Sequence, residues 1–267
     1  MSKTIFITGS TNGIGKLAAI KFAQDGHRII LHGRSPQKLQ KLIAEIKTVA
    51  QPAQLIGFTA DFADLGAVRK LGEEIKTAIP SLDILINNAG IFKSAQATNK
   101  EGLDIRMVVN YLAPYLLTES LLPLLAAAEA PQIINLSSAA QAPVSPAILR
   151  GTDQSHESET YAQSKLALTM WSFHLAKQHP DIAILALNPG SLLNTRMVQE
   201  AYGRYWSPAD KGANIIYDLA VGQAYQGMTG KYYDNDRGGF GPAHADAYDE
   251  QKVAALIKLT EEMLSKD

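Results

Sequence analysis

Residues 4–22 read TIFITGSTNGIGKLAAIKF, and this stretch decides the fold. It begins with a β-branched and aromatic run at 4–8, which predicts a buried strand, and continues at 13–25 with a helical period. The glycine-rich turn between them lets a ligand approach the backbone closely, and the helix start offers unpaired N–H groups and a positive dipole end to an anion. The stretch therefore predicts a dinucleotide-binding turn, although glycines also pack strands onto helices for structural reasons alone. Its residues are Gly9, Ser10, Thr11, Asn12, Gly13, Ile14 and Gly15.

Outward from this unit, apolar strands alternate with longer helical segments. Strands are predicted at 4–8, 28–32, 54–58, 82–86, 131–136 and 182–187, and helices near 13–25, 36–49, 64–78, 101–127 and 159–178. Strands joined by long crossovers pair in parallel, so we expect an α/β fold, a Rossmann-type doubly wound parallel sheet of about seven strands flanked by helices. The segment 246–265 predicts a final amphipathic helix. No boundary interrupts the pattern, so residues 1–267 are expected to form a single domain.

Composition excludes several classes of protein. The 25 Lys and Arg residues balance 26 Asp and Glu residues and form no long run, so no nucleic-acid partner is expected. The absence of cysteine rules out disulfides, thiolate nucleophiles and Cys-zinc sites. The six histidines are scattered and no pair has the spacing of a helical zinc motif, so we expect no metal site.

The chain is also expected to be cytoplasmic. Its N-terminus runs straight into the first strand without a signal-peptide core. The longest apolar stretch, 112–128, is interrupted by Pro114, Glu119 and Pro123 among other residues, which a membrane span would tolerate poorly. We therefore predict a buried helix there and no membrane span.

The end of the second strand bears on cofactor choice. It reads Leu31-His32-Gly33-Arg34-Ser35, where an NAD-selective protein would present an acid to the ribose hydroxyls. An acid would repel a 2′-phosphate, whereas a guanidinium holds it with two charge-assisted hydrogen bonds. Arg34, helped by Ser35, therefore predicts NADP(H) as the preferred cofactor and NAD(H) as the second choice. The alternative is that Arg34 only begins a solvated helix face.

Tyr161 and Lys165 begin an apolar helical segment, and their spacing of four residues puts them on one face, one turn apart. A phenol with a pKa near roughly 10 is a poor base at neutral pH, and a neighbouring cation favours its phenolate. The pair therefore predicts a tyrosine that exchanges a proton with the help of a lysine. On the pattern alone, the two residues could equally lie on an ordinary exposed helix face.

Together these motifs resemble those of the classical short-chain dehydrogenases/reductases. Thr8 and the turn after it match the family's T-G-x-x-x-G-x-G spacing, and Tyr161 and Lys165 match its tyrosine–lysine pair. The 22 residues between Ser138 and Tyr161 make this loop long, as in the retinol dehydrogenase-like branch. The resemblance spans about residues 3–196 and extends weakly to Gly230-Lys231-Tyr232-Tyr233.

The resemblance implies roles for further residues. A catalytic group would consist of Asn110, Ser138, Tyr161 and Lys165. Asn135 precedes Ser138 by three positions, as the family's marker does, which favours Ser138 over Ser137 as the hydroxyl at the substrate oxygen. Asn110 would bend its helix and hold a water, with a non-catalytic kink as the alternative. Besides the glycine turn and Arg34, the cofactor would contact Ser35, Asp61, Phe62, Asn88, Ala89, Gly90, Tyr161, Lys165, Pro189, Gly190 and Thr195.

These roles imply an NADP(H)-dependent oxidoreductase that moves hydride between nicotinamide and a carbonyl or alcohol. Ser138 and Tyr161 would donate hydrogen bonds to the oxygen where negative charge develops. Loops at 139–160 and 191–210 are expected to rim the substrate site, and their composition suits a bulky apolar aldehyde or ketone. A lid that closes only upon the protein itself is the alternative. The predicted substrate residues are Leu192, Leu193, Met197, Tyr202 and Trp206.

Other functions stay open. A non-catalytic NADP(H)-sensing regulatory protein could use the same fold, because fold alone does not determine function. A nucleotide-sugar epimerase or dehydratase is disfavoured by the turn spacing and the short tail. The helices predicted at 101–127 and 159–178 carry much apolar surface, and similar family members pair such helices across a two-fold axis. A homodimer is therefore a hypothesis.

Overall fold

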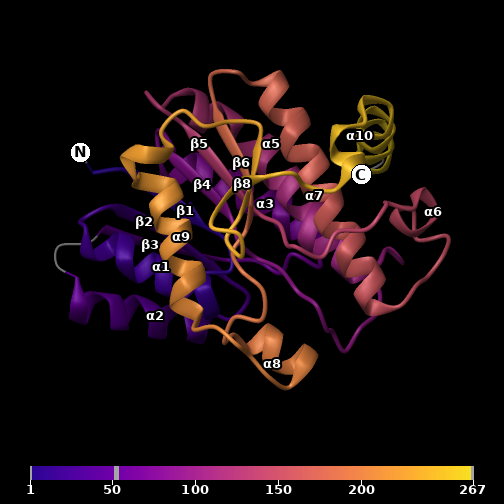
Figure 1. The fold of residues 1–267 in the computed structure, drawn as a ribbon. Helices are drawn as coiled ribbons and strands as arrows, with labels where there is room; N and C mark the ends of the chain where they lie inside the picture. Colours follow the sequence, from indigo (N-terminus) through magenta and orange to yellow (C-terminus); the bar gives the residue numbers. More distant parts are fainter. Residues whose placement is uncertain (1, 51–53, 266–267) are drawn as a thin grey trace.

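A single eight-stranded sheet forms the centre of the molecule in the computed structural model, which describes residues 2–50 and 54–265 (Figure 1). Its order is β3-β2-β1-β4-β5-β6-β7-β8, and every pair is parallel except β7 with β8. The strands are β1 (Thr4–Ile7), β2 (Arg28–Gly33), β3 (Gln54–Thr59), β4 (Ile84–Asn87), β5 (Gln132–Leu136), β6 (Ala183–Asn188), β7 (Lys231–Asp234) and β8 (Gly239–Gly241). The predicted doubly wound parallel sheet is confirmed, with one added antiparallel edge strand.

Helices cover both faces of this sheet (Figure 1). One layer contains α1 (Gly13–Gln24), α2 (Pro36–Val49) and α9 (Ala209–Val221), and the other contains α3 (Leu65–Ala78), α5 (Ala113–Ala126) and α7 (Glu157–Gln178). Ile5 and Ile7 of β1 face the first layer, whereas Phe6 faces the second. Because both faces are covered, the strands are apolar on both sides, as in other parallel sheets.

Several elements differ from the prediction. The strands β7 and β8 and the helices α6 (Pro146–Leu149), α8 (Arg196–Tyr202) and α9 were not predicted. The β8 strand has three residues and α8 buries none of its side chains, so neither carries a hydrophobic period. By contrast, α9 buries Ala213, Ile216 and Leu219 on one side, a helical spacing that the sequence analysis overlooked.

The helix predicted at 101–127 is divided into three parts. It begins with α4 (Ile105–Met107), continues as a π-helical turn, η1 (Val108–Leu112), and ends as α5. In η1 the N–H of Ala113 donates to the carbonyl of Val108, five residues back. Pro114 follows directly and has no N–H to give to the carbonyl of Asn110, which favours this wider turn. The stretch Ile105–Ala126 is long and apolar enough for a membrane span, but it is mostly buried in the protein core, as predicted.

The final helix α10 (Glu250–Leu264) packs against α7 (Figure 1). It buries the predicted stripe, including Val253, Leu256 and Leu264, and its Thr260 hydroxyl hydrogen-bonds that of Tyr111 at 2.7 Å. Tyr111 is fully buried by this contact. Part of the apolar helix surface that favours a homodimer is therefore covered by α10 of the same chain. The homodimer stays a prediction, and it would require another surface or a displaced α10.

The carboxyl ends of the parallel strands define where a ligand can bind. The strand order reverses between β1 and β4, where the connections leave towards opposite faces of the sheet. In open α/β sheets, ligands bind beyond the carboxyl ends of the strands at this switch point. The segments that follow β1, β4, β5 and β6 carry the predicted site residues.

Candidate active site

Thr8 joins the glycine turn to the segment that follows β4. Its Oγ1 accepts hydrogen bonds from the backbone N–H groups of Asn88 and Ala89 at 3.0 and 2.9 Å. In return, Asn88 Nδ2 donates to the carbonyls of Thr8 and Gly9 at 2.8 and 3.2 Å. The turn and the β4 end are thus held together across the switch point, and Asn88 acts here through structural hydrogen bonds.

Glycine is required in this turn by backbone conformation and by close approach. Gly9 and Gly13 have φ values of +64° and +56°, in the left-handed region that side chains disfavour. A Cβ added to Gly15 would lie 2.3 Å from Asn88 Nδ2, which is too close for any side chain. A Cβ on Gly13 would lie 3.6 Å from Thr195 Cγ2, so the turn faces Thr195 across a narrow space. The turn ends at the N-terminus of α1, where unpaired N–H groups suit the pyrophosphate of a dinucleotide.

His32 supports the same turn, a function that the sequence analysis did not recognise. Its Nδ1 accepts the N–H of Gly9 at 3.1 Å, and its Nε2 lies 3.1 Å from the carbonyl of Ala60. Burial lowers the pKa of His32 to about 4, so the ring is neutral at pH 7 and can accept at one nitrogen while donating at the other. Phe62 stacks on this ring at 4.4 Å between centroids.

The predicted adenosine contacts lie around the ends of β2 and β3. Arg34 is exposed, and its guanidinium makes no hydrogen bond or ion pair within residues 2–50 and 54–265. The Ser35 hydroxyl accepts the N–H of Lys38 and donates to Gln37, so its first task is to cap α2. Asp61 is exposed and accepts the N–H of Ala63, while the Phe62 side chain is buried. Any cofactor contact by Phe62 must therefore use its backbone.

Tyr161, Lys165 and Ser138 meet at the carboxyl edge of the sheet. Tyr161 and Lys165 lie on α7, and Ser138 follows β5. The Ser138 side chain lies close enough to the Tyr161 hydroxyl to lower its pKa. Lys165 is only 4% exposed, donates to the carbonyl of Leu136 at 2.7 Å, and places Nζ 5.7 Å from the centre of the Tyr161 ring. The structure thus brings together three of the four residues predicted to form the catalytic group.

Burial changes the acidity of both α7 groups. It raises the pKa of Tyr161 to about 12, with a decrease from the nearby Ser138 side chain and a further increase from nearby Tyr202. Burial also lowers the pKa of Lys165 to about 8. The tyrosine is therefore a neutral phenol at pH 7 and can give a proton, while the lysine is charged but close to titration.

The two adjacent serines have different surroundings. Ser137 is buried and donates to the carbonyl of Lys165 at 3.1 Å, with the Thr169 hydroxyl 2.7 Å away. Ser138 faces Tyr161 instead and receives the N–H of Ala140 at 3.1 Å. Geometry therefore favours Ser138 as the hydroxyl that can reach a substrate.

Asn110 projects from the π-helical turn η1. Its Oδ1 accepts the N–H of Ile91 at 2.8 Å, and its Nδ2 donates to the Ile91 carbonyl at 3.0 Å and to Ser164 Oγ at 3.0 Å. A Cβ on Gly90 would lie 3.3 Å from Asn110 Oδ1 and 3.5 Å from Lys165 Nζ. Glycine at position 90 therefore keeps a side chain out of the space between Asn110 and Lys165.

Asn135 and Asn87 form an interior network that the sequence analysis did not predict. Asn87 Nδ2 donates to Asn135 Oδ1 at 2.7 Å and to Thr118 Oγ1 at 3.0 Å, and Asn135 Nδ2 donates to Ser172 Oγ at 2.8 Å. All four side chains are buried. The network ties β4 and β5 to α5 and α7, so Asn135 supports Ser138 from within the core.

The Pro189–Gly190 turn after β6 is held by residues that follow β7. Asp236 accepts the backbone N–H and the hydroxyl of Ser191 and the side-chain amide of Asn188. Burial acts to raise the pKa of Asp236, but these hydrogen bonds and the charge of Lys211 lower it overall. Gly190 has φ +121°, so the turn also depends on glycine. An acidic residue just beyond a strand end is the signal that could have identified Asp236.

The predicted substrate residues separate into two groups. Tyr202 lies near the reactive centre, because its ring is 5.6 Å from that of Phe92, which in turn is 4.8 Å from Tyr161. Trp206 is 72% exposed and contacts Arg204, whereas Leu192, after β6, and Met197, in α8, are partly exposed. A substrate role for Leu193 does not fit, because its side chain is buried against Gly190 and Gly212. Phe92 was missed, since nothing local marks it as a neighbour of Tyr161.

Comparison with known proteins agrees with this geometry. The chain matches the family of short chain dehydrogenases over residues 3–205. The proposed daunorubicin C-13 ketoreductase DnrU of Streptomyces sp. (strain C5) is 34% identical over 245 residues, covering 88% of this chain and 84% of that protein. Retinol dehydrogenase 13 of Mus musculus is 29% identical over 255 residues, covering 88% and 76%.

A solved structure supports the same relationship. A proposed short chain dehydrogenase of Shigella flexneri 2a, complexed with NADP, has a TM-score of 0.71 and 26% identity to this chain, covering 88% of it and 97% of that chain. The family match, the parallel sheet and the Tyr161–Lys165–Ser138 group lead to one conclusion. The chain belongs to the short-chain dehydrogenase/reductase family and is an NAD(P)-dependent oxidoreductase that acts on CH–OH groups.

Proposed function

We propose that this protein uses NADPH to reduce the carbonyl group of a bulky, apolar aldehyde or ketone. The observation that carries the proposal is the meeting of Tyr161 and Ser138 beside buried Lys165, at the edge where the glycine turn lies. Two hydroxyls that converge on one point can both donate to a single substrate oxygen. A neutral phenol at pH 7 suits proton donation, and hence reduction.

The residues of this chain divide the work between binding and proton transfer. The glycine turn would place a pyrophosphate at the N-terminus of α1, whose N–H groups and dipole favour an anion. When bound, the nicotinamide cofactor supplies the hydride. Ser138 and Tyr161 hold the carbonyl oxygen, and Tyr161 Oη then transfers its proton to that oxygen. The charge of Lys165 stabilises the phenolate left behind.

A test of the cofactor preference uses Arg34→Ala. We expect the Kd for NADPH to rise by about 10- to 100-fold, because a charged hydrogen-bonded contact contributes about 1.5–3 kcal/mol. The Kd for NADH should change by less than about twofold, since NADH has no 2′-phosphate. Fluorescence titration of both nucleotides measures the two values. Equal losses for NADPH and NADH would show that Arg34 does not bind the phosphate.

The pH dependence of reduction is a second test. Because burial lowers the pKa of Lys165 to about 8 and raises that of Tyr161 to about 12, the lysine loses its charge before the phenol loses its proton. The rate of carbonyl reduction should therefore fall as the pH rises through about 8. Initial rates at saturating NADPH from neutral to alkaline pH, with NADPH binding checked at each value, measure this. A rate that stays constant well beyond that range would contradict the role of Lys165.

The substrate class rests on the aromatic side chains near Tyr161. Phe92 and Tyr202 lie side by side next to its ring, which favours a large apolar group attached to the carbonyl. The names of DnrU and retinol dehydrogenase 13 also refer to large organic carbonyl or alcohol compounds. A screen of NADPH oxidation with aldehydes, ketones, quinones and retinoids is the direct experiment. Turnover of only small polar carbonyls would reject the proposed class.

A non-catalytic NADP(H) sensor is the second candidate function. Exposed residues in α8, including Tyr202, could present a partner surface instead of a substrate wall. The complete Tyr161–Lys165–Ser138 group favours the enzyme, because a sensor has no need for it. Tight NADPH binding together with no turnover in the screen would favour the sensor.

A further inference from the structure

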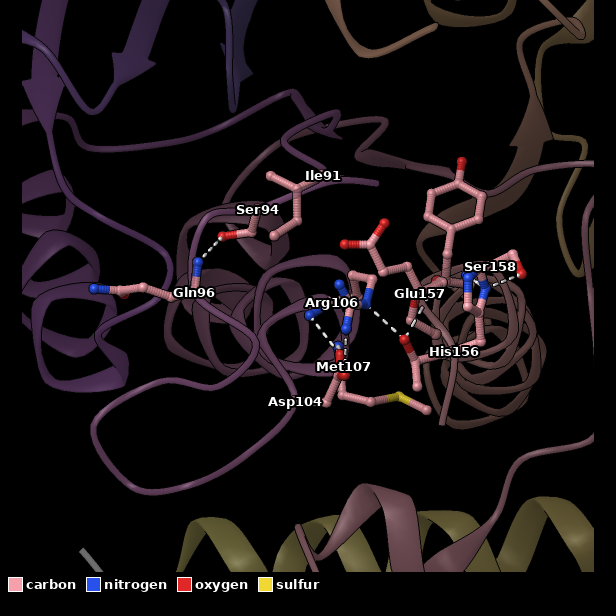
Figure 2. A network of polar contacts seen from close by, with 12 residues as sticks. Ile91, Ser94, Gln96, Asp104, Arg106, Met107, His156, Glu157 and Ser158 are labelled. Carbon is pink, nitrogen blue, oxygen red and sulfur yellow. Dashed lines mark hydrogen bonds and ion pairs between the residues drawn. The ribbon is translucent and has the colours of Figure 1, made fainter. Parts of the chain in front are cut away.

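Arg106 is a buried charged residue that none of the roles described so far uses. It lies in α4 and is only 3% exposed. Its Nη2 pairs with Asp104 Oδ2 at 2.6 Å, and its Nε donates to Thr160 Oγ1 at 2.5 Å. Figure 2 shows Arg106 between Asp104 and the start of α7, where His156, Glu157 and Ser158 are labelled. The guanidinium therefore connects α4 to the helix that carries Tyr161.

Asp104 contacts both the side chain of Arg106 and the N-terminus of α4, the helix that contains Arg106. Its Oδ1 accepts the N–H of Arg106 at 2.8 Å and that of Met107 at 3.4 Å, so it caps α4. Its Oδ2 takes the guanidinium. The Asp104 side chain is 14% exposed, so this ion pair is largely removed from water. The pair thereby fixes the direction in which Arg106 reaches α7.

Two similar contacts join the α4–η1 segment to α7. Arg106 binds Thr160, and Asn110, four residues later, binds Ser164, four residues after Thr160. Thr160 directly precedes Tyr161, and Ser164 directly precedes Lys165. Each residue of the proposed catalytic pair thus follows a residue that is fastened to the α4–η1 segment. Residues one turn apart on each helix share a face, so the two contacts together set the axial position of α7.

A buried ion pair is suited to setting a position. Desolvation of the two charges offsets most of their attraction, so such pairs add little net stability. Their strict geometry instead favours one arrangement over its neighbours. The planar guanidinium of Arg106 reaches its two acceptors through different nitrogens, Nη2 and Nε, which fixes its orientation.

We propose that Arg106, held by Asp104, is a positioning residue. Through its hydrogen bond to Thr160 it sets the position of Tyr161 relative to Ser138 along the axis of α7. This inference rests on the proposed function, because it concerns the same proton donor. Ser138 follows β5 rather than lying on α7, so a shift of α7 along its axis would change the distance between the two hydroxyls. A misplacement of about 1 Å can lower a catalytic rate by about 100-fold.

The experiment compares three threonine variants of the full chain. Thr160→Val keeps the shape and removes the acceptor of Arg106, whereas Thr160→Ser keeps the hydroxyl. Thr260→Val is the matched control, because Thr260 is equally buried and its loss leaves the Tyr111 hydroxyl without its partner, away from Tyr161. For each variant, kcat, KM for the carbonyl, Kd for NADPH and the free energy of unfolding are measured.

We expect Thr160→Val to lower kcat by about tenfold, a fraction of the loss caused by a 1 Å misplacement. Its Kd for NADPH should stay within about threefold, because the glycine turn and Arg34 lie on other elements. Thr160→Ser keeps the hydroxyl, so its kcat should lie within about twofold of the wild type. Thr260→Val should lower the free energy of unfolding without lowering kcat. An unchanged kcat in Thr160→Val, or equal losses in the two valine variants, would overturn the proposal.

A second variant covers the case in which Thr160→Val does not fold. Asp104→Asn keeps the cap and a neutral acceptor for Arg106, and it should lower kcat by about threefold without changing NADPH binding. An unchanged kcat in this variant would also reject the positioning role. In both variants the loss must appear in kcat rather than in KM, since the substrate-binding surface is unaltered.

The result can be separated from the fate of the proposed function. Wild-type turnover tests that function, whereas the ratio of variant to wild-type kcat tests the positioning of Tyr161. If the wild type reduces no carbonyl, crystal structures of the variants give the answer. A Tyr161 hydroxyl displaced from Ser138 in Thr160→Val but not in Thr260→Val supports the inference, and an unmoved hydroxyl in Thr160→Val overturns it.

Discussion

Replacement of Tyr161 by phenylalanine should lower kcat for carbonyl reduction by about 10²- to 10⁴-fold, the usual contribution of a general acid. The hydroxyl near Ser138 disappears, while the ring that packs 4.8 Å from Phe92 stays. The Kd for NADPH should therefore remain within about threefold, because most cofactor contacts are predicted elsewhere. Stopped-flow or steady-state kinetics with a carbonyl from the screen, and fluorescence titration of NADPH, measure the two quantities.

Tyr202→Phe is the matched control for this experiment. It removes a phenol hydroxyl from the same aromatic group, where Tyr202 lies 5.6 Å from Phe92, but from a residue with no proposed proton transfer. Its kcat should stay within about threefold of the wild type. Wild-type activity in Tyr161→Phe would reject the proposed mechanism, and a similar large loss in both variants would indicate a role of the aromatic group in substrate binding.

The second large effect is expected for Ser138→Ala. Removal of one hydrogen-bond donor at a developing negative charge lowers kcat by about 10²- to 10³-fold. The KM for the carbonyl should change less than kcat, because the bond strengthens only as the negative charge forms. Comparison of kcat and KM with those of the wild type at saturating NADPH tests this expectation.

Ser137→Ala distinguishes the two neighbouring serines. Ser137 bonds the carbonyl of Lys165 and lies beside Thr169 within the core, so its loss should reduce the free energy of unfolding by about 1 kcal/mol. Its kcat should stay within about threefold of the wild type. The opposite pattern, with a large kcat loss only in Ser137→Ala, would move the substrate contact to Ser137.

Much of the fold could be predicted because its signals are local. The β1–turn–α1 unit and the strand–helix alternation depend on residues close in sequence, and the structure confirms both. The edge strand β8 and helix α8 escaped prediction because they are short and bury little. The π-helical turn at η1 was not predicted either. Pro114 indicates that a backbone hydrogen bond is lost, but not whether the helix kinks or widens there.

The candidate site could likewise be predicted only where its signals are local. The spacing of Tyr161 and Lys165 is a property of one helix, so the sequence alone indicated that they share a face. Phe92, His32 and Asp236 were missed as site residues, because each acts on a segment far along the chain: Phe92 on Tyr161, His32 on Gly9, and Asp236 on Ser191.

The sequence by itself therefore determined the parallel sheet, the glycine turn and the tyrosine–lysine pair, because backbone conformation and helical spacing are set by neighbouring residues. Only the tertiary structure decided that Phe92 packs against Tyr161, and that Arg106 holds Thr160 from 54 residues away. Such contacts form only when strands and helices pack into one core. Their geometry depends on the whole fold, and no short stretch of the chain contains it.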